Sequence, residues 1–196
     1  MREVVIDTET TGLSYKNGDR IIEVGCVELI NHVATNNFLQ FYCKVDKEIS
    51  ESAQKITGIT NRFLSNKNNF SDHHQEFLGF ISNDPLIIHN ADFDVGFINN
   101  ELRLVKRDEI KKEQVIDSLE IAREKYPGAS NSLDALCKRF NIDLSRRIKH
   151  NALLDCELLR EVYINLLGVK EPKLVFSNDK DERNISIQKN LSLIHI

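Results

Sequence analysis

Apolar residues in the first 45 positions fall into short runs separated by polar turns, which is the pattern of β-strands. Three runs rich in β-branched and aromatic residues predict strands over residues 3–8, 20–30 and 38–45. Residues 31–37 (NHVATNN), between the last two runs, have the composition of a turn. The pattern therefore predicts that the three strands form a meander.

After residue 45 the apolar residues recur at helical spacing. Helices are predicted over residues 71–82, 93–104, 118–126, 132–140 and 151–167, with short strands over residues 86–89 and 115–117. The first helix would be capped at Ser71, would bury Phe77, Leu78 and Ile81, and would end before Pro85. Early strands followed by alternating strands and helices predict an α/β fold, with helices flanking a mixed central β-sheet.

The composition changes after Gly168, a residue typical of the C-terminal end of a helix. Residues 170–196 have a charged middle (SNDKDERN), no clear period and an apolar end (LSLIHI). We interpret residues 1–168 as one domain and residues 169–196 as a flexible tail outside it.

The bulk composition is that of an ordinary globular domain, with 41% apolar and 29% charged residues among 196. No stretch approaches the roughly 20 apolar residues of a membrane helix. The first ten residues contain an acidic pair instead of the basic start and apolar run of a secretory signal. We therefore expect a cytoplasmic protein that does not contact membranes and whose cysteines stay reduced, namely Cys26, Cys43, Cys137 and Cys156.

The net charge of −4 argues against a broad phosphate-binding surface, because proteins that wrap duplex DNA carry a basic footprint. It does not exclude an enzyme that holds a few terminal nucleotides and uses divalent cations to neutralise their phosphates.

Two carboxylates stand at the end of the first predicted strand, in the segment DTETTG (residues 7–12). Side chains alternate between the faces of a strand, so Asp7 and Glu9 share one face. Their repulsion needs compensation, which a pair of hard divalent cations with oxygen ligands would supply. The alternative is a solvent-facing strand end that runs into a Thr-Gly turn.

A second acidic motif, HNADFD (residues 89–94), follows the predicted strand LIIH and opens a helix. A strand-to-helix turn presents side chains at the edge of a sheet. The alternative is that both aspartates serve the helix alone, one as its cap and one as a favourable charge in its first turn. We interpret Asp92 as the cap and Asp94 as a functional residue.

The third motif is HNALLD (residues 150–155). Five residues on an ideal helix correspond to about 140° of rotation, so His150 and Asp155 would not share a face of one helix. They converge only if His150 precedes the helix, with Asn151 as its N-cap. A histidine on a mobile loop near fixed carboxylates is typical of a general base that closes onto substrate. The alternative is an isolated surface or core histidine.

Together the three motifs resemble the DEDD exonuclease superfamily, in its His-type branch. The Tyr-type branch has a tyrosine four residues before the last aspartate, where this chain has Asn151. Over residues 3–168 the chain further resembles the ε-type proofreading 3′→5′ exonucleases of bacterial DNA polymerase III. The matching segments are IIEVGCVELI, FDVGF, DSL, NSLDALCKRF and LLDCELLREVY.

This resemblance implies an RNase H-like fold and a role for each matching residue. The implied metal ligands are Asp7, Glu9, Asp94 and Asp155. His150 would be the general base, and Asp92 is outside the family pattern. The family contacts the terminal nucleotide through the segment that corresponds to residues 52–59 (SAQKITGI), where Ser52 and Thr57 are expected to face the substrate. Better-known members carry Glu and His at these two positions, so this chain departs from the pattern there. The expected substrate contacts also include Asp7, Glu9 and Asp155.

The resemblance further implies two Mg²⁺ or Mn²⁺ ions, which in two-metal sites lie about 3.5–4 Å apart. One ion would lower the pKa of a bound water, His150 would take its proton, and the other ion would stabilise the leaving 3′-oxyanion. The substrate would be the 3′ end of single-stranded or mispaired DNA, the products nucleoside 5′-monophosphates, and the partner the polymerase (α) subunit. The basic residues before His150 would contact phosphates or form a solvated turn, namely Arg146, Arg147 and Lys149.

Two other functions are consistent with these motifs. The first is a ribonuclease of the same superfamily, similar to RNase T or oligoribonuclease. The second is a binding module that keeps the fold without turnover, although all five catalytic positions are filled.

Residues 171–176 (EPKLVF) resemble the clamp-binding peptides, Gln-x-x-Leu/Met-x-Phe, that ε-type subunits can carry after the nuclease domain. Leu174 and Phe176 match the apolar anchors, whereas Glu171 replaces the usual glutamine. The alternative is a linker whose apolar residues pack back on the domain. Residues 177–196 would bind the polymerase by family analogy alone.

Overall fold

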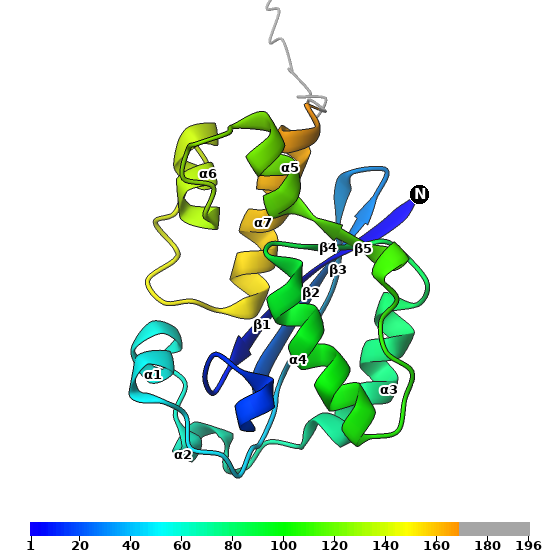
Figure 1. Ribbon diagram of the computed structural model, residues 1–196, viewed down its shortest axis with the longest axis vertical. Coiled ribbons are helices and arrows are strands. Elements are labelled where there is room, and N and C mark those ends of the chain that lie inside the picture. Colours follow the sequence, from blue (N-terminus) through cyan, green and yellow to red (C-terminus); the bar gives the residue numbers. More distant parts are fainter. Residues whose placement is uncertain (169–196) are drawn as a thin grey trace, which may run out of the picture.

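A five-stranded mixed β-sheet forms the centre of the protein, and the computed structural model describes residues 1–168 (Figure 1). The strands lie in the order β3-β2-β1-β4-β5. Their bounds are β1 Arg2–Thr10, β2 Ile21–Ile30, β3 Val33–Tyr42, β4 Leu86–Ile88 and β5 Val115–Asp117. The first three strands are antiparallel neighbours, while β4 pairs in parallel with β1 and β5 with β4. The predicted mixed sheet and meander are confirmed.

The third strand begins earlier than predicted. Asn31 and His32, with positive φ angles of 51° and 63°, turn the chain, and β3 starts at Val33. The prediction of a turn over residues 31–37 is therefore wrong. β3 is an edge strand whose first residues are exposed or half-buried, so polar side chains occupy it without entering the core.

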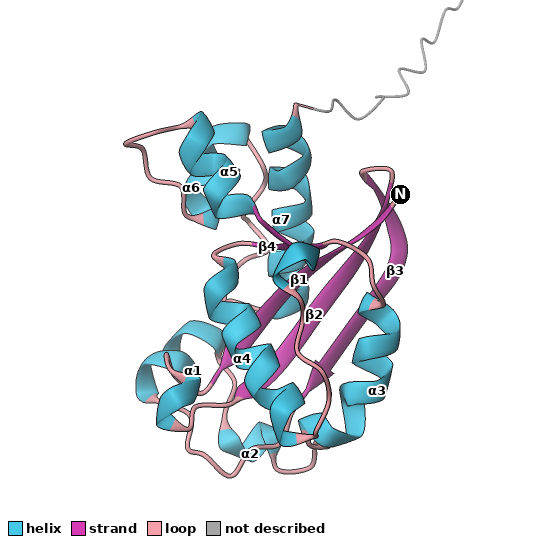
Figure 2. Cartoon of the chain, turned by 45° about the vertical axis from the view of Figure 1, so that its right-hand side comes forward, coloured by secondary structure: helices cyan, strands magenta, loops and turns pink. Residues whose placement is uncertain are grey.

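Helices cover both faces of the sheet (Figure 2). One face carries α3 (Phe70–Ile81) and α4 (Ala91–Leu104). The other carries α7 (Ala152–Leu167), with α5 (Ser118–Lys125) and α6 (Leu133–Phe140) packed beside it. Four short elements were not predicted: the helices α1 (Glu51–Thr57) and α2 (Asn61–Leu64) and the 3₁₀ turns η1 (Tyr15–Asn17) and η2 (Lys112–Gln114).

The start of α3 differs from the prediction, because Ser71 lies inside the helix. Asn69 holds the N-cap position, and its N–H donates to Oδ2 of Asp72 at 2.9 Å. The predicted buried face is present, with Phe77 and Ile81 buried and Leu78 packed against them.

The helices α4 and α7 begin with different N-cap geometries. α4 begins at Ala91, so Asp92 lies in its first turn and is not its cap, contrary to the prediction. Asn90 holds the cap position in the left-handed conformation, with a φ of 68°. Asn151 caps α7 as predicted, since its Oδ1 accepts the N–H of Leu154 at 3.1 Å.

Alternate residues of the strands fill two separate cores. Val4 and Ile6 of β1 face α3 and α4, whereas Val5 faces α7. Asp7 and Glu9 therefore continue the odd-numbered row of β1 that faces α7. The four cysteines are buried and free, as predicted.

α7 approaches β2 closely at Gly25, where a side chain would not fit. A Cβ on Gly25 would lie 2.5 Å from the backbone carbonyl carbon of Ala152. Sγ of Cys156 donates to the carbonyl oxygen of Gly25 at 3.2 Å. The first two turns of α7 are thereby fixed against the sheet.

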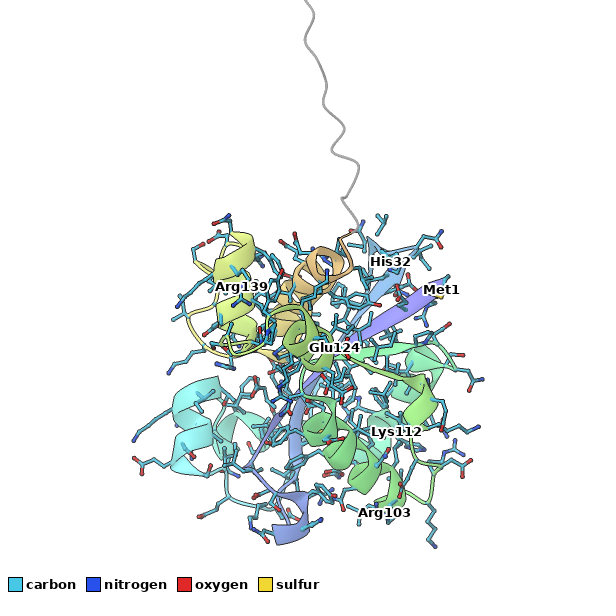
Figure 3. The ribbon with its side chains drawn as sticks, turned by 45° about the horizontal axis from the view of Figure 1, so that its top comes forward. Met1, His32, Arg103, Lys112, Glu124 and Arg139 are labelled. Atoms are coloured by element: carbon cyan, nitrogen blue, oxygen red, sulfur yellow. The ribbon has the colours of Figure 1, made fainter. Side chains whose placement is uncertain are left out.

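Both ends of the described chain lie at its surface. Met1 lies beside the turn that contains His32, and the N–H of Asn31 donates to the carbonyl oxygen of Met1 at 2.8 Å (Figure 3). Gly168 ends α7 in the left-handed conformation, with a φ of 71°, as predicted. Within residues 1–168, no helix combines the length and hydropathy that a membrane span requires. The predicted tail and its residues 171–176 lie outside the described residues.

Candidate active site

The carboxylates of Asp7 and Glu9 stand near the C-terminal end of β1, on the side that α7 covers. Both residues are partly exposed, while Thr8 and Thr10, which alternate with them, are buried. This alternation confirms that Asp7 and Glu9 share one face of the strand.

Asp94 reaches the same strand end from the first turn of α4. It is 4% exposed, and its Oδ1 accepts hydrogen bonds from the N–H and Oγ1 of Thr8, at 3.0 and 2.6 Å. Because Thr8 lies between Asp7 and Glu9, these bonds bring a third carboxylate to the pair. Asp92, two residues earlier, is exposed.

α7 and the loop before it supply Asp155 and His150. An oxygen of Glu9, an oxygen of Asp155 and a ring nitrogen of His150 lie within 4.8 Å of one another. The His150 side chain is 46% exposed and that of Asp155 only 3%, and Nδ1 of His150 is 3.4 Å from Oδ2 of Asp155. The structure thus places His150 before the helix, as the motif predicts.

Burial and mutual repulsion favour the protonated forms of three carboxylates. Burial, with the charge of Asp155 added, raises the pKa of Glu9 to about 8. Burial also raises the pKa of Asp94 to about 7, although Thr8 donates to it. The pKa of Asp7 is raised by burial and then by the charges of Asp94 and Asp155. These carboxylates therefore lack sufficient positive charge from the chain itself.

The fourth carboxylate, Asp155, differs because Arg147 binds it. Nε and Nη2 of Arg147 donate to Oδ1 and Oδ2 of Asp155, both at 2.6 Å. Burial alone would raise the pKa of Asp155, but these bonds hold it below its ordinary value. Nη2 also lies 3.0 Å from Nδ1 of His150. The Arg147 side chain is 8% exposed, so the interpretation as a solvated turn is wrong for this residue.

The other two basic residues of this loop point away from the carboxylates. Arg146 lies 3.6 Å from Glu157 on α7. Nζ of Lys149 donates to the carbonyl oxygen of Lys55 on α1. The N–H of His150 donates to the carbonyl oxygen of Ile56 at 3.1 Å, so two bonds join the His150 loop to α1.

The predicted substrate contacts lie on α1. Ser52 is exposed, and its Oγ lies 3.1 Å from that of Ser50. Thr57 is buried, and its Oγ1 donates to the carbonyl oxygen of Ala53 at 2.9 Å and accepts the N–H of Ile59 at 3.0 Å. Ser52 is therefore open to a nucleotide, whereas the hydroxyl of Thr57 is engaged within the protein. The contact of either residue with substrate stays a prediction.

Asp117, which the sequence analysis did not single out, holds the turn that carries Asp94. Its carboxylate accepts the N–H groups of Asn90 and Ala91, at 3.0 and 2.9 Å. It also caps α5 by accepting the N–H of Leu119 at 2.8 Å. The sequence could have indicated this role, because Asp117 precedes Ser118 at the end of a predicted strand, and an aspartate at that position often caps the following helix.

Comparison with known proteins identifies the family of this chain. Residues 4–163 match the family described as Exonuclease, of the RNase_T type. The chain belongs to the exonuclease family. This exonuclease is similar to DNA polymerase III subunit epsilon of Rickettsia prowazekii, with 46% identity over 187 residues that cover 94% of this chain and 82% of the relative. It is also 45% identical to the Salmonella typhimurium subunit over 174 residues, covering 85% of this chain and 72% of that one.

Solved structures confirm the fold that the resemblance implies. Exonuclease X in complex with 5′ overhanging duplex DNA superposes with a TM-score of 0.68 and 25% identity, over 85% of this chain and 91% of that one. The nuclease domain of 3′hExo, a DEDDh family member bound to rAMP, gives a TM-score of 0.73 and 18% identity, and the match covers 85% of this chain and 92% of that one. The exonuclease therefore has the RNase H-like fold of this family.

The residues of this site fit divalent cations, on which this exonuclease family depends. Hard cations prefer carboxylate oxygens, and here oxygens of Glu9 and Asp155 lie within 4.8 Å of each other. Burial raises the pKa values of Asp7, Glu9 and Asp94, and neighbouring carboxylates raise those of Asp7 and Glu9 further. A bound cation would favour the ionised form of each carboxylate.

Proposed function

We propose that this exonuclease removes nucleotides from the 3′ end of DNA as the proofreading subunit of a bacterial replicative polymerase, releasing nucleoside 5′-monophosphates. The convergence of Glu9, Asp155 and His150 within 4.8 Å carries this proposal, because it joins metal-binding oxygens to a candidate base. The 46% identity to a polymerase III epsilon subunit supports the choice of DNA and of proofreading.

Four carboxylates would hold two Mg²⁺ or Mn²⁺ ions: Asp7, Glu9, Asp94 and Asp155. When bound, the ions would lower the pKa of a water molecule and neutralise charge on the leaving 3′-oxygen. The bonds from Thr8 orient Asp94, whereas Arg147 binds both oxygens of Asp155 and would have to release at least one of them to a cation.

His150 is the general base of the proposed reaction. Nearly half of its side chain is exposed, so a water molecule above the carboxylates can reach it. Nη2 of Arg147 can only donate, so Nδ1 of His150 accepts from it at 3.0 Å, and His150 takes a proton from water once that contact is released. Its backbone bond to Ile56 holds the base next to α1, where Ser52 and Thr57 would receive the terminal nucleotide.

The proposal includes two partners. The polymerase α subunit would bind the exonuclease, and residues 171–176 of the tail would bind the sliding clamp. Calorimetry with a peptide of residues 171–178 tests the clamp contact, and Leu174→Ala or Phe176→Ala should each cost more than about 1 kcal/mol of binding free energy. No binding at millimolar peptide would leave the linker interpretation for this segment.

A primer with a mispaired 3′ end tests the proposed activity. We expect release of nucleoside 5′-monophosphate with Mg²⁺ or Mn²⁺, faster from the mispaired than from the paired primer, and none with EDTA. The Asp7→Ala, Glu9→Ala double variant should be inactive but folded, whereas Asp92→Asn, on the exposed side of α4, should stay active. Faster cleavage of short RNA would favour the ribonuclease alternative, and binding without release would favour the binding module.

A further inference from the structure

A fifth carboxylate, that of Glu23, lies beside the active site but outside the set that the motifs contain. Glu23 stands on β2, directly opposite Glu9 of β1 and Tyr42 of β3 in the strand register. The residue is 0% exposed. A buried carboxylate next to Glu9 is costly for folding, because both burial and like charge disfavour its ionised form.

Three polar side chains surround Glu23. Its Oε1 accepts hydrogen bonds from Nε2 of Gln40 and from Nδ2 of Asn151, both at 2.7 Å. The hydroxyl of Tyr42 lies 3.3 Å from each of these amide nitrogens. Oε2 of Glu23 is buried and has no hydrogen-bond partner within the described residues. The network therefore holds Glu23 through Oε1, the oxygen that Asn151 binds.

Asn151 connects this network to the catalytic residues. Its Nδ2 donates to Glu23, and its Oδ1 accepts the N–H of Leu154 and so caps α7. It directly follows His150, and the turn that it caps contains Asp155. The side chain of Asn151 thus links the start of α7, next to His150, to Glu23 of the sheet.

We propose that Glu23 is a positioning residue for the exonuclease reaction, which through Asn151 fixes His150 and the first turn of α7 relative to Glu9. The inference rests on the proposed function, since it assigns Glu23 a role in the reaction of that site. Glu23 does not touch the reacting atoms in this arrangement. It acts through the hydrogen bond to Asn151, so its amide analogue should serve nearly as well as the carboxylate.

Another buried glutamate offers a matched control. Glu3 on β1 is also 0% exposed, and its Oε1 accepts the hydroxyl of Tyr163 near the other end of α7, at 3.0 Å. Both glutamates therefore anchor α7 to the sheet, but only Glu23 does so beside His150. Variants at Glu3 measure the effect of a lost anchor without a direct effect on the base.

The experiment compares Glu23→Ala, Glu23→Gln, Glu3→Ala and Asn151→Asp in the full chain. Glutamine can keep its carbonyl oxygen in the place of Oε1, whereas aspartate at position 151 keeps the helix cap but cannot donate to Glu23. Glu23→Ala and Asn151→Asp should lower kcat by on the order of 10²-fold with little change in KM, because misplacing a catalytic group by about 1 Å has that effect. Glu23→Gln and Glu3→Ala should keep most of kcat.

A second readout does not depend on activity. The imidazole NMR signal of His150, assigned by its loss in His150→Ala, should shift or broaden in Glu23→Ala and Asn151→Asp in EDTA without DNA. It should stay in place in Glu23→Gln and Glu3→Ala.

Full kcat with an unchanged His150 signal in Glu23→Ala would overturn the proposal. Equal changes in Glu3→Ala would also overturn it, because the cause would then be general loosening of α7. If the wild-type chain released no nucleotide, the proposed function would fail, while the His150 signal would still decide whether Glu23 positions that residue.

Discussion

Arg147 binds the oxygens of Asp155 that the proposed cations need. Removal of its guanidinium should therefore lower the stability of the chain in EDTA and strengthen its binding of cations. The substitution Arg147→Met keeps the length of the aliphatic stem and removes the guanidinium. It breaks two hydrogen bonds of 2.6 Å to Asp155, the contact of 3.0 Å with Nδ1 of His150 and the ion pair with the exposed Asp134. Asp155 then stands near Glu9 without its arginine partner.

The magnitude follows from the burial of the pair. The side chains of Arg147 and Asp155 are 8% and 3% exposed, so solvent screens their interaction weakly. Breaking a buried ion pair costs about 3–5 kcal/mol, and protonation of the freed carboxylate should hold the loss near the lower figure. A loss of about 3 kcal/mol corresponds to a fall in Tm of roughly 6–12 °C for a chain of this size. Bound cation should return part of it, about 1.4 kcal/mol for each tenfold gain in cation affinity.

The assay is denaturant or thermal unfolding of both proteins, in EDTA and in saturating Mg²⁺ or Mn²⁺, with calorimetry of cation binding. Arg103→Met is the matched control, because Arg103 pairs with Glu109 in the same chemistry but with side chains 58% and 51% exposed. That exposed pair should contribute only about 0–1 kcal/mol, and its loss should not depend on the cation. If Arg147→Met lost the same stability with and without cation, and bound the cation no more tightly, the idea that the guanidinium substitutes for a cation would be refuted.

Three further predictions concern the same site. His150→Ala should lower the rate of nucleotide release by about 10²–10⁴-fold while calorimetry still detects cation binding, as expected for loss of a general base. Glu9 and Asp94 have raised pKa values of about 8 and 7 in the folded chain, so the folded state holds more protons than the unfolded state above the ordinary carboxylate pKa. Stability in EDTA should therefore fall as pH rises from about 5 to 8, and saturating cation should flatten that slope in unfolding experiments. Gly25→Ala should displace the first turn of α7, because the new Cβ would lie 2.5 Å from its backbone, and should reduce kcat and Tm together. An unchanged kcat in Gly25→Ala would show that the turn accommodates the methyl group.

The positions of the candidate carboxylates could be predicted from sequence because local rules decide their placement. Strand alternation puts Asp7 and Glu9 on one face whatever else the chain does, and the burial pattern agrees. Helix geometry requires His150 to precede α7, and the cap at Asn151 provides that break. Strand alternation or a helix cap is thus sufficient to predict where these residues lie.

Other features depend on contacts between distant segments, which no local pattern contains. In the sequence, Arg147 is one of several basic loop residues, and only the folded chain shows that it binds Asp155 of α7. Glu23 is a polar position in an apolar strand, and only the folded chain shows its hydrogen bond to Asn151. The helices α1 and α2 are too short for a clear period, and β3 begins with exposed polar residues because it is an edge strand.

The contact between Gly25 and α7 also determines when the candidate active site is completed during synthesis of the chain. β1 carries Asp7 and Glu9, α4 carries Asp94, and both are synthesised before α7, the last helix of the described chain. Until Ala152 and the residues after it seat against Gly25, the sheet face that α7 covers is open, and neither Asp155 nor His150 is in place. A nascent chain, or one ended by a stop codon before α7, would therefore hold three of the four candidate carboxylates without Asp155 and His150, and we expect it to release no nucleotide.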